Sequence, residues 1–209
     1  MSEGFEPRLE ALGAAQRRAW MGLAATKMKA ILDHASLRDY VEIAGLLEAG
    51  VDLSHALGAA LAMFGPQYNP LLSLKALTFF EAGDVRKLGS KGRHRLTEAV
   101  RKVNLEGLAQ ARRSSRLDNP KDLKRVAHEV VWFKEPEETL ADRNFFLAHV
   151  MTYGTVEDVS TARRHFSAEE FRAALENAPA GVFDPRSWAY WNTVLGRVPV
   201  PPLPKRRLE

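Results

Sequence analysis

The chain has 209 residues, of which 45% are hydrophobic, and this is enough for one or two folded domains. It contains no cysteine, which excludes disulfides, thiolate metal sites, iron–sulfur clusters and cysteine nucleophiles. The formal net charge of +4 is small, so charge alone assigns no partner.

The first residues do not have the charge order of a secretory signal, because Glu3 and Glu6 precede the first apolar run. No apolar stretch approaches the length of a bilayer span. We therefore expect a cytoplasmic protein without a membrane segment.

Almost every segment places apolar residues at the three-to-four spacing of a helix. Gly50 and Gly65 stand where helices typically end, and Asp52 is a capping residue at a helix start. Ser167 and Glu170 have the spacing of a capping box. After a short helix that carries Lys27, the expected helices cover residues 37–50, 53–65, 70–80, 92–103, 105–112, 120–130, 142–154, 167–177 and 185 onward. Alternating strand patterns are nearly absent, so the predicted class is all-α.

Residues 111–120, with the sequence ARRSSRLDNP, have almost no apolar content and are interpreted as a basic polar linker. It separates two small helical lobes, 23–110 and 121–209, and residues 1–22 precede the first. The second lobe ends in a proline-rich, basic tail, which we expect to be extended over 198–204.

Basic residues are concentrated in the middle of the chain, with thirteen Lys and Arg against four Asp and Glu between residues 86 and 125. Such a belt is typical of phosphate contacts with RNA or DNA, and equally of a solvated helix face, which we favour. No aromatic residues for base stacking lie within it. The candidate nucleic-acid-binding residues are Arg93, Arg95, Arg112, Arg113 and Arg116.

A second cluster joins Lys27 to Arg38, Asp39 and Glu42 at the head of the next helix. Asp39 and Glu42 are three residues apart, so both carboxylates lie on one side of that helix. They would suit a divalent cation, with Glu42 as metal ligand and Arg38 near phosphate. The alternative, which the residues alone favour, is a surface ion-pair cluster.

The stretch LAATKMKAILDHASLRDYVEIAGLLEAGVDL, followed by FGPQYNPLLSLKALTFFEAGDV, resembles part of the AbiEii/AbiGii-type nucleotidyltransferase toxins. That part follows their nucleotide-binding palm domain, and the resemblance covers roughly residues 23–103. It implies catalytic roles for Lys27 and Asp39 that supplement the carboxylates of the palm. Glu42 stands where the family usually has Asp. The first twenty residues are similar to the segment that precedes the palm.

The palm itself has no counterpart in this sequence. Such an enzyme needs a Gly-Ser turn for the triphosphate and acidic residues on adjacent strands for two metal ions. The Gly-Ser pair at Gly89-Ser90 is followed by KGRHRL instead of an Asp-x-Asp strand. We therefore expect no nucleotide transfer by the chain alone, with magnesium and NTP as cofactors only if a separate palm-bearing chain takes part.

The second lobe, with VVWFKEPEETLAD, FFLAHVMTYGTVEDV, GVFDPRSWAYWNTVLGR and VPPLPKRRL, resembles a short bacterial helical family. That resemblance implies an antitoxin-like or accessory role. Trp188, Tyr190 and Trp191 are expected in a core. The six histidines are not paired at ligand spacing, and His149 is interpreted as a hydrogen-bonded core residue.

The sequence leaves three hypotheses open. The first is a toxin–antitoxin-related helical protein without catalytic core, acting through contacts with an antitoxin or toxin partner or with nucleic acid. The second is a component of a nucleotidyltransferase that transfers NMP to tRNA or protein together with a palm-bearing chain. The third is a basic module that binds RNA or DNA.

Overall fold

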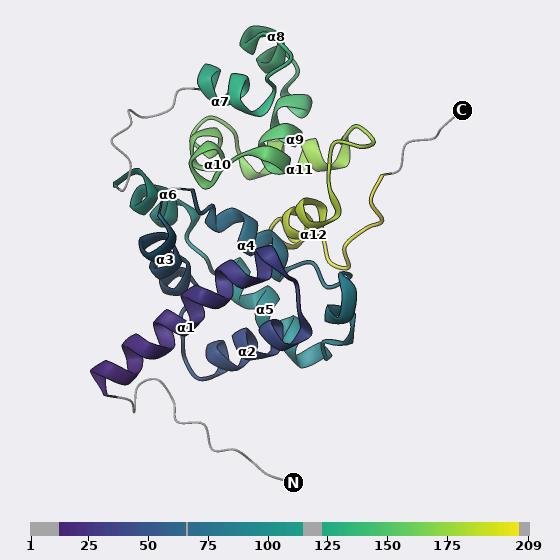
Figure 1. Cartoon of the computed structure of the whole chain (residues 1–209). Coiled ribbons are helices and arrows are strands. Elements are labelled where there is room, and N and C mark those ends of the chain that lie inside the picture. The colour runs from purple at the N-terminus through teal and green to yellow at the C-terminus, as the bar shows by residue number, and fades with distance from the viewer. Residues whose placement is uncertain (1–12, 66, 115–122, 205–209) are drawn as a thin grey trace. The chain divides into compact units, whose positions relative to one another are not determined.

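The structure is a computed structural model and describes residues 13–65, 67–114 and 123–204, apart from the side chains of 110–114. Within these residues the chain is all-α, as predicted, and has no strand (Figure 1). It divides into two compact units, Met1–Asn104 and Leu105–Glu209, and each is described by itself.

The first unit is organised around one long helix. Its elements are α1 (Ala14–Asp33), α2 (Leu37–Glu48), α3 (Leu53–Phe64), α4 (Pro70–Leu77), the 3₁₀ helix η2 (Gly83–Lys87) and α5 (Ser90–Arg101). Helix α1 packs against α2, α3 and α4, and α5 packs against α2 and α4 (Figure 1). Lys27 lies on this helix of 20 residues, whereas a short helix was expected. The helix is long because Gly22 is the one glycine in it, and a single glycine is tolerated among good helix formers.

Local signals in the sequence set the starts and ends of these helices. The side chains of Ser36, Asp52 and Asn69 accept hydrogen bonds from backbone amides in the first turns of α2, α3 and α4. Gly50 and Gly65 follow α2 and α3 with φ of 103° and 77°, values that favour glycine. Helix α4 ends at Leu77, before the expected residue 80, where the Thr78 hydroxyl bonds back to the carbonyl oxygens of its own helix.

Buried hydroxyl groups connect the helices of the first unit. The Tyr40 hydroxyl donates to the carbonyl oxygen of Ala76 at 2.7 Å. The Ser73 hydroxyl donates to the carbonyl oxygen of Met28, also at 2.7 Å. Since a buried polar group is costly without a partner, these bonds fix α2 and α1 against α4 in one arrangement.

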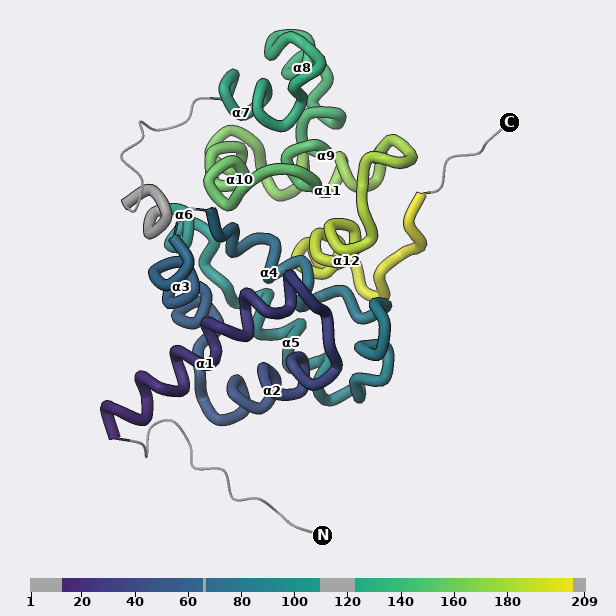
Figure 2. The backbone as a smooth tube through the Cα atoms, viewed as in Figure 1, coloured from purple at the N-terminus to yellow at the C-terminus, as the bar shows by residue number. Residues whose placement is uncertain are grey.

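The second unit is built around helix α9. Its helices are α6 (Leu105–Ser114), α7 (Leu123–Val130), α8 (Pro136–Ala141), α9 (Arg143–Tyr153), α10 (Val156–Arg163), α11 (Ala168–Glu176) and α12 (Pro185–Val194). Helix α9 contacts α7, α8, α10, α11 and α12 (Figure 2). The Trp191 indole nitrogen on α12 donates to the carbonyl oxygen of Met151 on α9 at 2.8 Å. The expected aromatic core of Trp188, Tyr190 and Trp191 is buried.

The organisation differs from the expected one in two places. Helix α6 extends through the first four residues of the expected linker 111–120, and it packs against α10 in the second unit. Residues 115–122 lie outside the described part. Helices α8 and α10 were not expected, although Thr155 and Asp158 form a capping box at the start of α10.

Across the described ranges, no helix has both the length and the apolar character that crossing a membrane requires.

Candidate functional site

The cluster expected around Lys27 is present and joins the first two helices. Lys27 lies on α1 and Asp39 in the first turn of α2, and the residues between the two helices turn the chain back on itself. Ser36 caps α2 and holds Asp39 on both sides: it accepts from the Asp39 amide at 3.2 Å and donates to Asp39 Oδ2 at 2.6 Å. The short connection and the cap thus place the Asp39 carboxylate beside α1.

Both carboxylates of the cluster are bound to cations of the same chain. Lys27 Nζ lies 2.7 Å from Asp39 Oδ1 and also bonds to Glu42 Oε2. Arg38 Nε lies 2.8 Å from Glu42 Oε1. With Ser36 on Asp39 Oδ2, each of the four carboxylate oxygens has a hydrogen-bond donor.

The cluster is partly shielded from solvent, which strengthens these bonds. The side chains of Lys27 and Asp39 are 18% and 15% exposed, whereas Arg38 is 85% exposed. Burial works against ionisation of Asp39, but the hydrogen bonds from Lys27 and Ser36 outweigh it, so the pKa of Asp39 is lowered. The hydrogen bonds from Lys27 and Arg38 lower the pKa of Glu42, and those to Asp39 and Glu42 raise the pKa of Lys27.

This arrangement bears on the expected metal role of Glu42. A magnesium or calcium ion needs a set of oxygen ligands, and here the two nearest carboxylates hold Lys27 and Arg38 instead. A cation would have to displace the Lys27 ammonium. In the part of the chain that the structure describes, no three His, Asp or Glu side chains gather closely enough to hold a metal ion.

An apolar groove lies beside the cluster, between α1 and α2. It has a volume of about 410 Å³. Leu23 of α1 and Val41 of α2 line it and are 46% and 52% exposed. Glu42, which bonds to Lys27, is also part of its wall. The ion-pair cluster therefore opens onto an exposed apolar surface.

The basic residues singled out for nucleic acid have different surroundings. Arg93 donates to the carbonyl oxygen of Leu88 at 2.9 Å and lies over the ring of Phe80, so it serves the fold of the first unit. Arg95 is bound to Glu48 at 2.6 Å. Arg112 and Arg113 lie on α6, where the structure describes the backbone only, and Arg116 is outside the described residues.

Sequence reasoning missed Ser36 as a member of the Lys27 cluster. The signal was available, because serine three residues before an acidic residue at a helix start is a capping pattern. His149 is buried and hydrogen-bonded to the carbonyl oxygen of Phe145 at 2.8 Å, as expected for a core histidine.

Comparison with protein-family models, with curated proteins and with solved structures finds no match to this chain.

Proposed function

We propose that this chain is a cytoplasmic, toxin–antitoxin-related helical protein that acts by contacts with a partner protein and does not transfer nucleotides on its own. One observation carries the proposal: the two carboxylates of the candidate site, Asp39 and Glu42, are bound to Lys27 and Arg38 of the same chain. The cluster then works as a tie between α1 and α2.

The chemistry of nucleotide transfer supports this assignment. In metal-assisted phosphoryl transfer, acidic residues hold cations that bridge the phosphates and neutralise developing charge. Here the candidate acids already have their charge balanced by Lys27 and Arg38. The sequence also lacks a Gly-Ser turn followed by an Asp-x-Asp strand.

The groove between α1 and α2 supports a role in protein contacts. Exposed side chains such as Leu23 and Val41 gain free energy when a partner covers them, at about 25 cal/mol for each Å² of apolar surface buried. The adjoining ion-pair cluster supplies a polar rim, the usual surrounding of an apolar contact patch. The partner we propose is the toxin or antitoxin protein of the same system.

The direct test is a transfer assay with the purified chain, each labelled NTP, magnesium and total tRNA. We expect no label on tRNA or on protein, in the original chain or in the variants Lys27→Ala and Asp39→Ala. Label that appears with the original chain and is lost in both variants would overturn the proposal.

A second candidate is the support half of a nucleotidyltransferase whose palm lies on another chain. It is favoured by the partly exposed side chains of Lys27 and Asp39, and by Glu42, which bonds to Lys27 and lines the groove. The assay is repeated with a palm-bearing nucleotidyltransferase chain added. Label that requires both chains, is lost with Lys27→Ala and is kept with the control Lys29→Ala would establish this second function in place of the first.

A further inference from the structure

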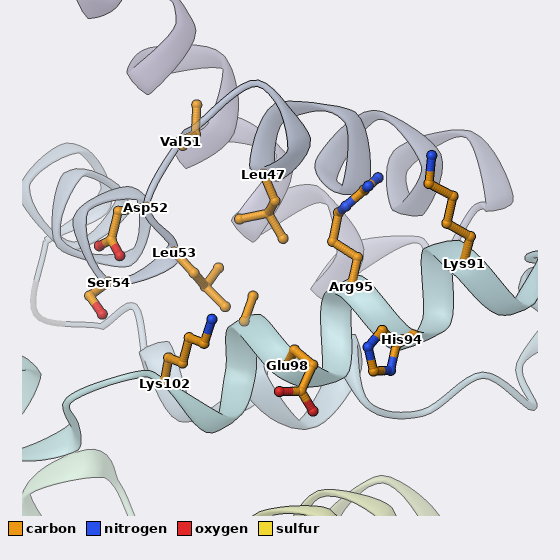
Figure 3. A pocket seen from close by; sticks show the side chains of 11 residues that line it. Leu47, Val51, Asp52, Leu53, Ser54, Lys91, His94, Arg95, Glu98 and Lys102 are labelled. Carbon is orange, nitrogen blue, oxygen red and sulfur yellow. The ribbon is translucent and has the colours of Figure 1, made fainter. Parts of the chain in front are cut away.

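A second cavity in the first unit lies where the end of α2, the start of α3 and one face of α5 meet (Figure 3). Its volume of about 470 Å³ falls in the range of small-molecule sites. It is separate from the Lys27 cluster and shares no lining residue with the groove between α1 and α2. A ligand of this cavity would be independent of the proposed function.

The middle of this cavity is apolar. Leu47 of α2, Val51 and Leu53 of the following segment and Ala99 of α5 line it. Val51 and Leu53 are buried, so this part of the wall belongs to the core and keeps its shape. Such a surface suits a flat or aliphatic group of a ligand, whereas a bare inorganic ion gains nothing from contact with it.

Cations stand at both ends of the apolar wall. Figure 3 shows Arg95 and Lys102 extending from α5 toward α2 and the start of α3, with Leu47 and Leu53 between them. Arg95 is held by Glu48 at 2.6 Å, and Lys91 bonds to the same carboxylate at 3.1 Å. These two cations therefore share one carboxylate at this end of the cavity.

The acidic residues of the lining are already bound to neighbours. Glu98 accepts from Arg101 at 2.7 Å. Asp52 accepts from the amide of His55 at 2.9 Å as the cap of α3, and the His55 ring lies 3.1 Å from the same oxygen. These contacts reduce the repulsion that the two carboxylates exert on an entering anion.

Lys102, His94 and Ser54 are the donors left for a ligand, and Lys102 is the cation among them. Among the residues that the structure describes, none of these three side chains has a hydrogen bond or an ion pair, and all three line the cavity. An ammonium group beside an apolar wall attracts an anion more strongly than one surrounded by water. The cavity therefore offers an unpaired cation next to a surface that an apolar body can cover.

We infer that this cavity binds a small phosphate ester whose organic part has an apolar surface, with the size and chemistry of a nucleoside monophosphate. The base or sugar lies over Leu47 and Leu53, and the phosphate is bound by Lys102. Phosphate suits the site because its oxygens accept several charged hydrogen bonds at once. A concave cavity with one free lysine favours a single small ligand over the row of backbone phosphates that RNA presents.

The test is calorimetric titration of the full chain with AMP and, separately, with inorganic phosphate. AMP is expected to bind at least about 10-fold more tightly than phosphate, because only AMP uses the apolar wall. Lys102→Ala is expected to weaken AMP binding about 10-fold, the effect of losing one charged hydrogen bond. Lys87→Ala removes an exposed cation outside the cavity and is the matched control, with unchanged affinity.

A second variant tests the apolar wall without changing charge. Ala99→Leu fills part of the cavity from within α5, where leucine is a good helix former, and is expected to weaken AMP binding while the helical circular dichroism stays the same. The proposal is overturned if AMP does not bind, if phosphate binds as tightly as AMP, or if Lys87→Ala weakens AMP as much as Lys102→Ala. A short single-stranded RNA that binds where AMP does not would also overturn it.

Discussion

Lys27 of α1 and Asp39 of α2 form an ion pair across the first connection between helices, with 2.7 Å between Nζ and Oδ1. The pair is backed on one side by the Ser36 hydroxyl and on the other by Glu42. Two helices that leave a short turn in opposite directions are thereby joined at a second point. If this tie has the proposed structural role, its loss must lower stability.

The first prediction is that Lys27→Met destabilises the protein by about 1 kcal/mol, the order expected for a partly shielded charged pair. Methionine keeps the length and helix propensity of the side chain, so the loss reports the charge. Urea unfolding followed by circular dichroism measures it. The control Lys29→Met breaks the exposed pair with Asp33 and is expected to cost less than about 0.5 kcal/mol. Equal effects of the two variants would contradict a special role for Lys27.

The same cluster predicts a specific loss of stability in acid. The pKa values of Asp39 and Glu42 are lowered in the folded state, so the unfolded chain binds more protons near pH 4. The contribution of Asp39 and Glu42 to the free energy of unfolding is fully present above their pKa values in the unfolded chain. It is lost as the pH falls through their lower pKa values in the folded protein. In the double variant Asp39→Asn, Glu42→Gln this part of the acid sensitivity should disappear. Unfolding free energies measured between pH 7 and 3 test it, and parallel curves for both proteins would refute it.

The elements that could be predicted from sequence are those fixed by local chemistry. Asp52 and Ser167 were expected to cap helices, and each accepts a backbone hydrogen bond at a helix start. Asn69, Asp142 and Asp184 do the same at the starts of α4, α9 and α12. The approach of Lys27 to Asp39 could also be expected, because a short turn joins their helices. In these cases the residues that interact are close in the sequence.

The features that could not be predicted depend on packing between distant residues. Lys102 and His94 belong to a cavity whose opposite wall includes Leu47, more than forty residues away, and nothing in the local pattern of α5 reveals it. Arg93 looked like a candidate for nucleic acid, but the folded chain places it over Phe80. A basic residue in a sequence does not show whether the fold has already bound its charge.

His149 gives a prediction for the second unit. Its ring is buried and contacts the rings of Phe145 and Tyr153, with centroids 4.1 and 5.8 Å away. Burial lowers the pKa of His149, and the positive charge of Lys134 lowers it as well. The hydrogen bond to Phe145 raises this pKa but does not outweigh burial. The folded state therefore disfavours protonation of His149. The contribution of this residue to the free energy of unfolding is fully present above about pH 6.5 and declines as the pH falls below that value.

The variant His149→Gln should lose this dependence, so its unfolding free energy changes less between pH 7.5 and 5.5 than that of the original chain. Glutamine keeps a side-chain donor for the Phe145 carbonyl oxygen. His165→Gln, at an exposed position of the same unit, is the control and should keep the original dependence. Identical pH curves for His149→Gln and the original chain would show that His149 does not contribute.

The last prediction compares two glycines. Gly154 ends α9 with φ of −64°, a value that any residue adopts, yet a methyl group there would lie 2.5 Å from the carbonyl oxygen of Val150. Gly58 lies inside α3, and a methyl group there would have no atom within 4 Å. Gly154→Ala is therefore expected to cost about 1–3 kcal/mol through the clash, whereas Gly58→Ala should stabilise by about 0.5–1 kcal/mol through helix propensity.

Urea unfolding of the two single variants measures both effects, and the signs should be opposite although the substitution is the same. The conformation of Gly154 requires no glycine, so its cost comes from the close approach of this residue to the Val150 carbonyl oxygen in the last turn of α9. A neutral Gly154→Ala would mean that this connection shifts by several tenths of an ångström at little cost. A loss in the expected range would mean that the backbone at the end of α9 cannot give way to the added methyl group.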